Sequence, residues 1–106
     1  MNEISIVLIT AGNEEEAARI GRTLVEERLA ACANIVPRLR SIYRWKGQIC
    51  DEQECLIIAK TRTSLFQSLE KRVKELHSYE VPEIISFPVV RGLPQYLEWV
   101  NMETGL

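Results

Sequence analysis

The chain has 106 residues, of which 46% are hydrophobic and 26% charged, and these proportions are typical of one globular domain spanning residues 1–106. A net charge of −2 gives no electrostatic basis for binding nucleic acid or an anionic membrane, and no apolar run approaches the ~20 residues that a membrane-spanning helix needs. The three cysteines are an odd number and the amino end lacks the basic segment of a secretory signal, so we expect a reducing, cytoplasmic location.

The first predicted elements are a strand and a helix. Residues 3–10 form a short apolar run rich in β-branched side chains, which favours a strand. Asn13 is a typical helix N-cap, and Glu16 three residues later predicts a capping box. Apolar residues then recur at the helical spacing, so we expect a helix that ends near residues 31–32, with Cys32 at its carboxyl end.

The next predicted unit is a long hairpin. Residues 33–45 have an extended pattern interrupted by Pro37, which indicates an edge strand with a bulge or a bend. Lys46 and Gly47 form the turn, and residues 48–61 form the return strand.

The remaining pattern predicts helix, strand and helix. Thr61 or Thr63 can cap a second helix whose apolar positions run from Phe66 to Leu76. A strand over residues 83–90 follows a stiff, proline-containing turn, and a short helix over residues 95–102 closes the chain.

The order β-α-β-β-α-β is typical of the α+β, ferredoxin-like plait, in which two helices cover one face of a four-stranded antiparallel sheet. Such a sheet should be polar on its other face, yet its strands are apolar on both sides, as in the run from Ile84 to Phe87. Leaving about half a dozen such side chains exposed, at roughly 1.5–3 kcal/mol each, would cancel most of a domain's stability. We therefore expect a homo-oligomer that covers the open face.

Five segments carry a resemblance to a known family: residues 27–35 (ERLAACANI), 41–47 (SIYRWKG), 60–61 (KT), 76–84 (LHSYEVPEI) and 96–99 (YLEW). Together, and in this order, they resemble the CutA divalent-cation tolerance family across essentially the whole chain. The resemblance implies a ferredoxin-like fold in a homotrimer, similar in architecture to the nitrogen-regulatory PII signal proteins. It also implies a role in divalent-cation tolerance, with copper as the metal.

His77 and Glu83 are the candidate metal ligands. His77 is the only histidine, and a neutral imidazole binds copper and zinc well; the alternative is a histidine that stabilises a helix carboxyl end. Carboxylates near it, at Glu80 and Glu83 and on the hairpin at Glu52 and Glu54, could complete a weak cation site across a subunit boundary. They could equally be surface charges or partners of helix ends.

The sequence contains no specific transition-metal motif beyond these residues. Some relatives carry a second histidine and a cysteine where this chain has Leu76 and Ile9, so the resemblance transfers only part of a copper site. Cys50 and Cys55 are five residues apart on an extended strand, face opposite sides, and cannot chelate one ion together.

Three functions remain after these observations. The first is a CutA-like homotrimer that binds divalent metal, copper(II) in particular, within or between subunits. The second is a PII-like scaffold that binds a small ligand or a protein partner at subunit clefts. The four aromatic residues Tyr43, Trp45, Tyr96 and Trp99 would then be either interface anchors or a ligand cage. An enzyme is the weakest of the three, because the chain has no glycine-rich phosphate loop and no nucleophile motif.

Overall fold

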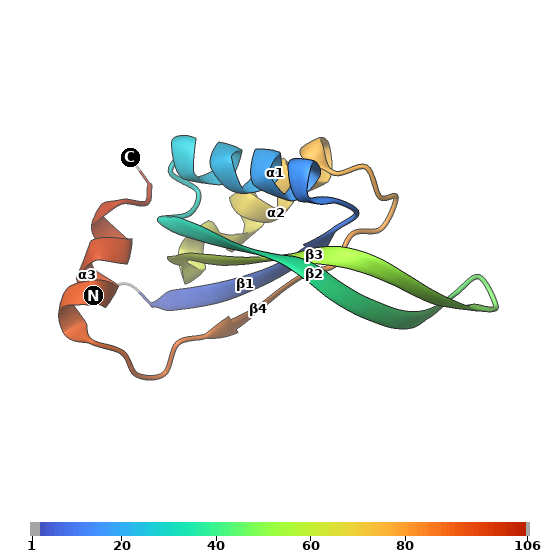
Figure 1. Cartoon of the computed structure of the whole chain (residues 1–106). Helices are drawn as coiled ribbons and strands as arrows, with labels where there is room; N and C mark the ends of the chain where they lie inside the picture. Colours follow the sequence, from blue (N-terminus) through green and yellow to red (C-terminus); the bar gives the residue numbers. More distant parts are fainter. Residues whose placement is uncertain (1–2, 106) are drawn as a thin grey trace.

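The computed structural model of the chain describes residues 3–105, which form one four-stranded antiparallel sheet and three α-helices. The strands are β1 (Ile4–Ala11), β2 (Cys32–Trp45), β3 (Gln48–Arg62) and β4 (Ile84–Pro88), and the helices are α1 (Glu14–Glu26), α2 (Phe66–Leu76) and α3 (Pro94–Met102). The strand order is β2-β3-β1-β4, and α1 and α2 lie on one face of the sheet (Figure 1). This arrangement confirms the predicted ferredoxin-like plait. None of the helices in the described part is long and apolar enough to cross a membrane.

The hydrophobic core lies between the sheet and the helices α1 and α2. Val7, Ile9 and Ile57 point from β1 and β3 into this layer and are completely buried. Leu24 of α1 and Leu69 of α2 meet them from the helical side and are equally buried. The apolar stripe of each helix, predicted from the helical spacing, therefore packs as expected.

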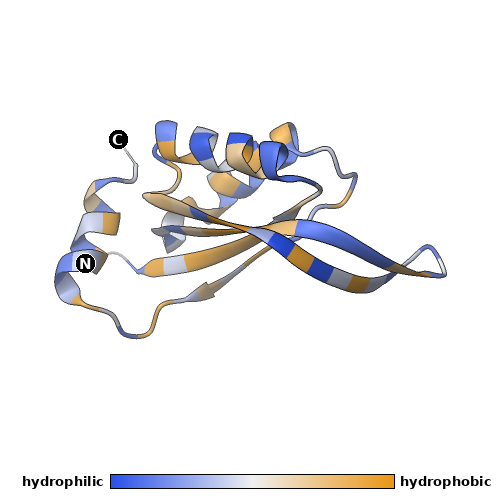
Figure 2. Ribbon diagram, viewed as in Figure 1, coloured by the Kyte–Doolittle hydropathy of each residue, from blue (hydrophilic) through white to orange (hydrophobic). Residues whose placement is uncertain are grey.

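The opposite face of the sheet is also apolar, and the single chain does not cover it. Leu8 pairs with Ile58 on one side and with Ile85 on the other, so their side chains share this face. Ile85 and Phe87 are 53% and 46% exposed. Helix α3 lies at one end of the sheet (Figures 1 and 2), where Val100 packs with Ile4 and covers only that end of the open face. The predicted surplus of apolar surface is confirmed.

Helix α1 ends at Glu26, about five residues earlier than the apolar pattern predicts. Arg28 has a positive φ of 60°, and the amides of Arg28 and Leu29 donate to the carbonyls of Val25 and Leu24. These two bonds form a Schellman motif, with arginine where glycine is usual. The expectation that Cys32 ends the helix is therefore wrong, because Cys32 is the first residue of β2.

Arg28 also joins two distant parts of the chain. Its guanidinium donates to the carbonyls of Met102 (2.7 Å), the last residue of α3, and of Gly105 (2.6 Å), just beyond it; the Gly105 amide donates back to the Arg28 carbonyl at 2.8 Å. These bonds hold the end of the chain against the turn after α1 and offset the cost of the left-handed backbone at Arg28.

Two capping predictions need correction. Asn13 caps α1 as expected, accepting from the Glu16 amide at 2.8 Å, but Glu16 does not close a capping box. Its carboxylate reaches the loop after α2 instead. Neither Thr61 nor Thr63 caps α2: Thr61 is buried and donates to the Leu29 carbonyl, and Thr63 begins the short 3-10 helix before α2 and hydrogen-bonds Ser5.

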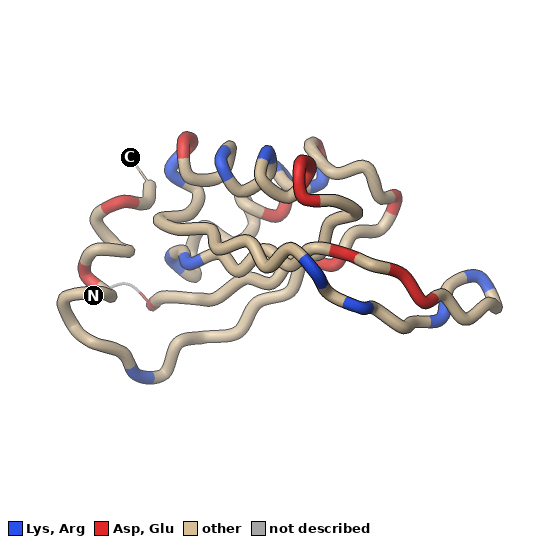
Figure 3. The backbone as a smooth tube through the Cα atoms, viewed as in Figure 1, with Lys and Arg blue, Asp and Glu red and all other residues tan. Residues whose placement is uncertain are grey.

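Beyond the end of β1, strands β2 and β3 continue as a two-stranded arm, residues 39–54, which extends away from the rest of the molecule (Figure 1). The register shifts between Val36 and Leu39, which confirms the bulge or bend predicted at Pro37. Lys46 and Gly47 turn the arm with φ values of 50° and 79°, as a two-residue hairpin requires. Basic residues gather on the β2 side of this arm and acidic residues on the β3 side (Figure 3).

Candidate ligand-binding cleft

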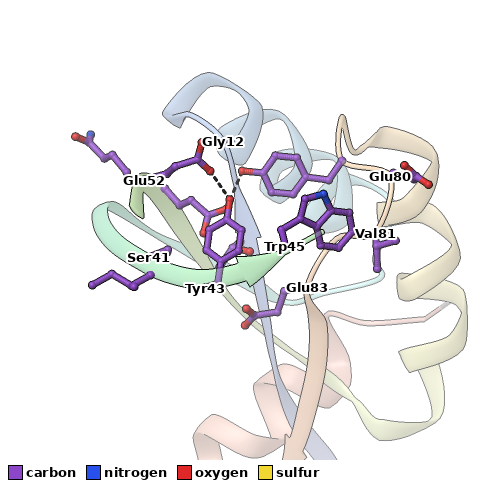
Figure 4. A pocket seen from close by; sticks show the side chains of 13 residues that line it. Gly12, Ser41, Tyr43, Trp45, Glu52, Glu80, Val81 and Glu83 are labelled. Atoms are coloured by element: carbon purple, nitrogen blue, oxygen red, sulfur yellow. Dashed lines mark hydrogen bonds between the residues drawn. The ribbon is translucent and has the colours of Figure 1, made fainter. Parts of the chain in front are cut away.

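A cleft of about 820 Å³ lies between the arm and the segment after α2. Tyr43, Trp45 and Glu52 come from the arm, and Glu80, Val81 and Glu83 come from the segment opposite (Figure 4). Its size is that of a pocket for a small organic molecule.

Side-chain alternation along the arm places one set of residues in the cleft. Ser41 is directly opposite Glu52 in the β2–β3 register, so both point to one side, together with Tyr43 and Glu54. Arg40 and Asp51 point to the other side and form a two-bond ion pair at 2.9 and 2.7 Å. The cleft face of the arm is therefore aromatic and acidic, and its basic residues lie elsewhere.

Two phenols inside the cleft donate to carboxylates. The Tyr79 hydroxyl donates to Glu54 Oε2 at 2.7 Å, and the Tyr43 hydroxyl donates to Glu52. The hydrogen bond to Glu52, helped by burial, raises the pKa of Tyr43, while burial and then the bond to Glu54 raise the pKa of Tyr79. Both phenols therefore stay protonated at neutral pH and cannot supply a negative charge or a base.

The cleft has a strong excess of negative charge. Four glutamates line it, at Glu52, Glu54, Glu80 and Glu83, and its lining holds no lysine, arginine or histidine within residues 3–105. Within the same residues, none of the four has a basic nitrogen within 4.0 Å. Glu54 is only 7% exposed, so its carboxylate is largely withdrawn from water with a neutral phenol as its partner.

The wall formed by the segment after α2 is fixed by Glu16 and His77. Glu16 accepts from the Ser78 amide at 2.7 Å, from the Ser78 hydroxyl at 3.0 Å and from the Gly12 amide at 3.4 Å. Burial alone raises the pKa of Glu16, but these bonds and nearby His77 outweigh it, so the pKa is lowered overall. The segment is thus tied to the amino end of α1 at the point where it leaves α2.

The His77 ring lies behind this wall and not on it. Its side chain is completely buried; Nε2 lies 2.7 Å from the Thr10 carbonyl oxygen and Nδ1 accepts from the Tyr79 amide at 3.0 Å. Glu16 lies 3.7 Å from Nδ1. Both ring nitrogens therefore have partners within the chain, and a metal ion bound to His77 would have to replace one of them.

The two candidate metal ligands are placed differently. Glu83 lines the cleft, whereas His77 does not. Within residues 3–105 no three histidine, cysteine or acidic side chains are grouped closely enough to hold a metal ion. A metal site that includes Glu83 therefore needs ligands beyond those that one chain groups together.

Sequence reasoning did not anticipate the two phenol–carboxylate pairs or the position of Glu16. The period-two pattern along residues 41–54 could have shown Tyr43 and Glu52 on one side of the arm. The Tyr79–Glu54 bond had no such signal, because it joins a loop to a strand 25 residues away in the sequence.

Comparison with known proteins gives consistent matches over nearly the whole chain. The model of the family described as "CutA1 divalent ion tolerance protein" matches residues 5–103. A divalent-cation tolerance protein CutA from Thermus thermophilus is 53% identical over 94% of this chain and 97% of its own length. The mouse protein CutA is 46% identical over 95% of this chain, which spans 57% of the mouse protein.

Solved structures agree with these sequence matches. The divalent cation tolerance protein from Thermus thermophilus superposes with a TM-score of 0.94 at 52% identity, covering 96% of this chain and 99% of that one. CutA1 from Oryza sativa gives a TM-score of 0.95 at 40% identity, covering 98% and 95%. Similar proteins include one described as chloroplastic, from Arabidopsis thaliana, and one described as periplasmic, from Archaeoglobus fulgidus.

Proposed function

Because the chain belongs to the CutA1 divalent ion tolerance family, we propose that it is a cytoplasmic homotrimer that binds divalent metal, copper(II) in particular, and is not an enzyme. The observation that carries this proposal is the acidic cleft, in which four carboxylates, Glu83 among them, have no basic partner within 4.0 Å in the described part of the chain. Such a cleft attracts cations from solution.

The trimer is supported by the open face of the sheet. Ile85 and Phe87 are about half exposed, so covering each contributes about half of the roughly 1.5–3 kcal/mol that burying a fully exposed side chain yields. Glu83 lies two residues before Ile85, and Glu54 two residues before Leu56, so the cleft continues the same face toward the arm. A neighbouring subunit on this face would bring its own ligands close to Glu83.

The ligand set we propose is Glu83 and His77, completed by groups from a second subunit. Glu83 is exposed in the cleft and can bind without rearrangement. His77 joins only if a nitrogen gives up Thr10 or Tyr79, which makes the site weak. Bound copper(II) would contribute its positive charge to the cleft, and the chain contributes the acidic surroundings that hold it.

Copper titration with electron paramagnetic resonance tests the ligand set. His77 is the only histidine, so any electron spin-echo modulation from an imidazole nitrogen on bound copper must come from it. We expect saturable calorimetric binding, this modulation, and at least tenfold weaker binding in Glu83→Gln but not in the exposed control Glu15→Gln. Copper binding without the modulation removes His77 from the set, and no saturable heat removes the metal proposal itself.

Light scattering tests the trimer independently of metal. We expect a mass of about 37 kDa, three times the 12.2 kDa chain, for the native protein at micromolar concentration. Phe87→Glu places a charge on the open face and should give monomers, whereas Val90→Glu, outside β4 at a residue that is 86% exposed, should not. A monomeric native protein would refute the trimer.

A further inference from the structure

The acidic cleft contains a buried carboxylate, that of Glu54, whose charge no basic group balances within residues 3–105. A buried carboxylate is normally paired with a cation or held by several hydrogen bonds, because withdrawing it from water is costly. Glu54 is 7% exposed, has one phenolic donor, and has no basic nitrogen within 4.0 Å in the described part of the chain. Glu52 from the arm and Glu80 and Glu83 from the other wall add three more negative charges around it.

The cleft is also too large and too aromatic for a bare metal ion to fill. Its volume of about 820 Å³ is roughly that of twenty-five to thirty waters at about 30 Å³ each. Tyr43, Trp45 and Tyr79 supply ring surface, and ring faces attract ammonium groups. The ammonium of Lys46 already lies 5.8 Å from the centre of the Trp45 ring, at the end of the arm.

We propose that this cleft binds an organic dication, two primary ammonium groups joined by an aliphatic chain, in addition to any metal ion. One ammonium pairs with Glu52 and Glu54 on the arm, and the other pairs with Glu83 on the opposite wall, where Glu80 points away from Glu83 (Figure 4). The methylene chain lies against the rings of Tyr43 and Trp45. This arrangement neutralises both walls and needs no close convergence of ligands, of which residues 3–105 hold none.

The protonation state of the cleft suits this ligand. Both phenols remain neutral because their hydrogen bonds and burial raise their pKa values, so they add no charge to the cleft and present uncharged rings. The cleft thus offers charge at two ends and apolar surface between them.

Tryptophan fluorescence measures this binding directly. The chain has two tryptophans, so Trp99→Phe leaves Trp45 as the sole emitter, inside the cleft. The native oligomer, freed of metal with a chelator, is titrated with 1,5-diaminopentane. We expect saturable change in Trp45 emission and a dissociation constant that weakens at higher salt. The neutral 1,5-pentanediol, equal in length, should give no saturable change.

Matched variants distinguish binding in the cleft from a general effect of the protein's negative charge. Glu52→Gln combined with Glu83→Gln removes one charge from each wall and should weaken diamine binding at least tenfold. Asp51→Asn removes a charge from the same arm, on the side away from the cleft, and should change binding less than twofold. Equal losses in both variants, equal binding of tetramethylammonium, or no saturable signal would overturn the proposal. Copper binding measured separately shows whether the metal site stands or fails on its own.

Discussion

Replacing Glu16 with alanine should destabilise the fold more than its place in the first turn of a helix suggests. Glu16 is 7% exposed and accepts from the amide and hydroxyl of Ser78, 62 residues away in the sequence. Removing the acceptor ends two hydrogen bonds to a charged group, each worth about 1.5–3 kcal/mol, and water recovers part of this at the exposed Ser78. We expect a loss of about 2–4 kcal/mol in the free energy of unfolding, and a smaller loss for Glu16→Gln, which keeps one acceptor.

The loss should depend on pH with a definite sign. The pKa of Glu16 in the folded chain is lowered from its ordinary 4.5. Its stabilising contribution is therefore complete above about pH 4.5 and disappears as pH falls through the lower, folded value. The difference between wild type and Glu16→Ala should be largest near pH 7 and should shrink steadily at pH 4 and below.

Urea denaturation at fixed protein concentration measures both effects, since an oligomer's apparent stability depends on concentration. Glu15→Ala is the matched control: Glu15 is the neighbouring carboxylate and is exposed, so its loss removes only a helix-dipole interaction of about 0.3–1 kcal/mol. If the two variants differ by less than about 0.5 kcal/mol, or if the Glu16→Ala penalty grows toward low pH, the tie between α1 and Ser78 does not act as described.

Three further changes test local features. Gly47→Ala meets no neighbouring atom but places a side chain at a φ of 79°, so urea denaturation should show a loss of about 1 kcal/mol. Arg28→Ala should cost about 1 kcal/mol more than Arg28→Gly, because both lose the bonds to Met102 and Gly105 but only glycine suits the positive φ. Burial, with nearby carboxylates, raises the pKa of Cys55, so mass spectrometry should find this thiol unmodified by a thiol reagent at pH 8 until the chain unfolds.

The sequence predicts the fold well because the fold depends on local periodicity. The apolar stripes of α1 and α2, the Lys46–Gly47 turn and the bulge at Pro37 each have a short-range cause, and each is present. The end of α1 was missed because its signal is a glycine at the left-handed position, and here Arg28 takes that position. Arginine is held there by carbonyls near residue 105, a contact that no local pattern reveals.

The candidate site was predicted less completely, since it depends on contacts between distant segments. Glu83, Glu52 and Glu54 were expected as possible cation ligands, and the structure places all three on one cleft. Glu16 was assigned to a capping box from its spacing to Asn13. In the structure the Glu16 carboxylate accepts from the Ser78 amide, just after α2. That contact cannot be predicted from residue spacing along one helix.

The open face and the cleft are one continuous surface, and this has a consequence for how ligand and assembly affect each other. Glu54 and Glu83 continue the alternation of Leu56 and Ile85, so a subunit that covers the apolar part must approach the acidic part. Four carboxylates without a basic partner in residues 3–105 repel one another when a neighbour excludes water from them, and a bound cation reduces that repulsion. Cation binding should therefore strengthen subunit association, and association should strengthen cation binding by the same factor. Thermodynamic coupling between two equilibria acts in both directions. A cation that binds the assembled protein more tightly than the single subunit, yet leaves the subunit association constant unchanged, would therefore contradict this linkage.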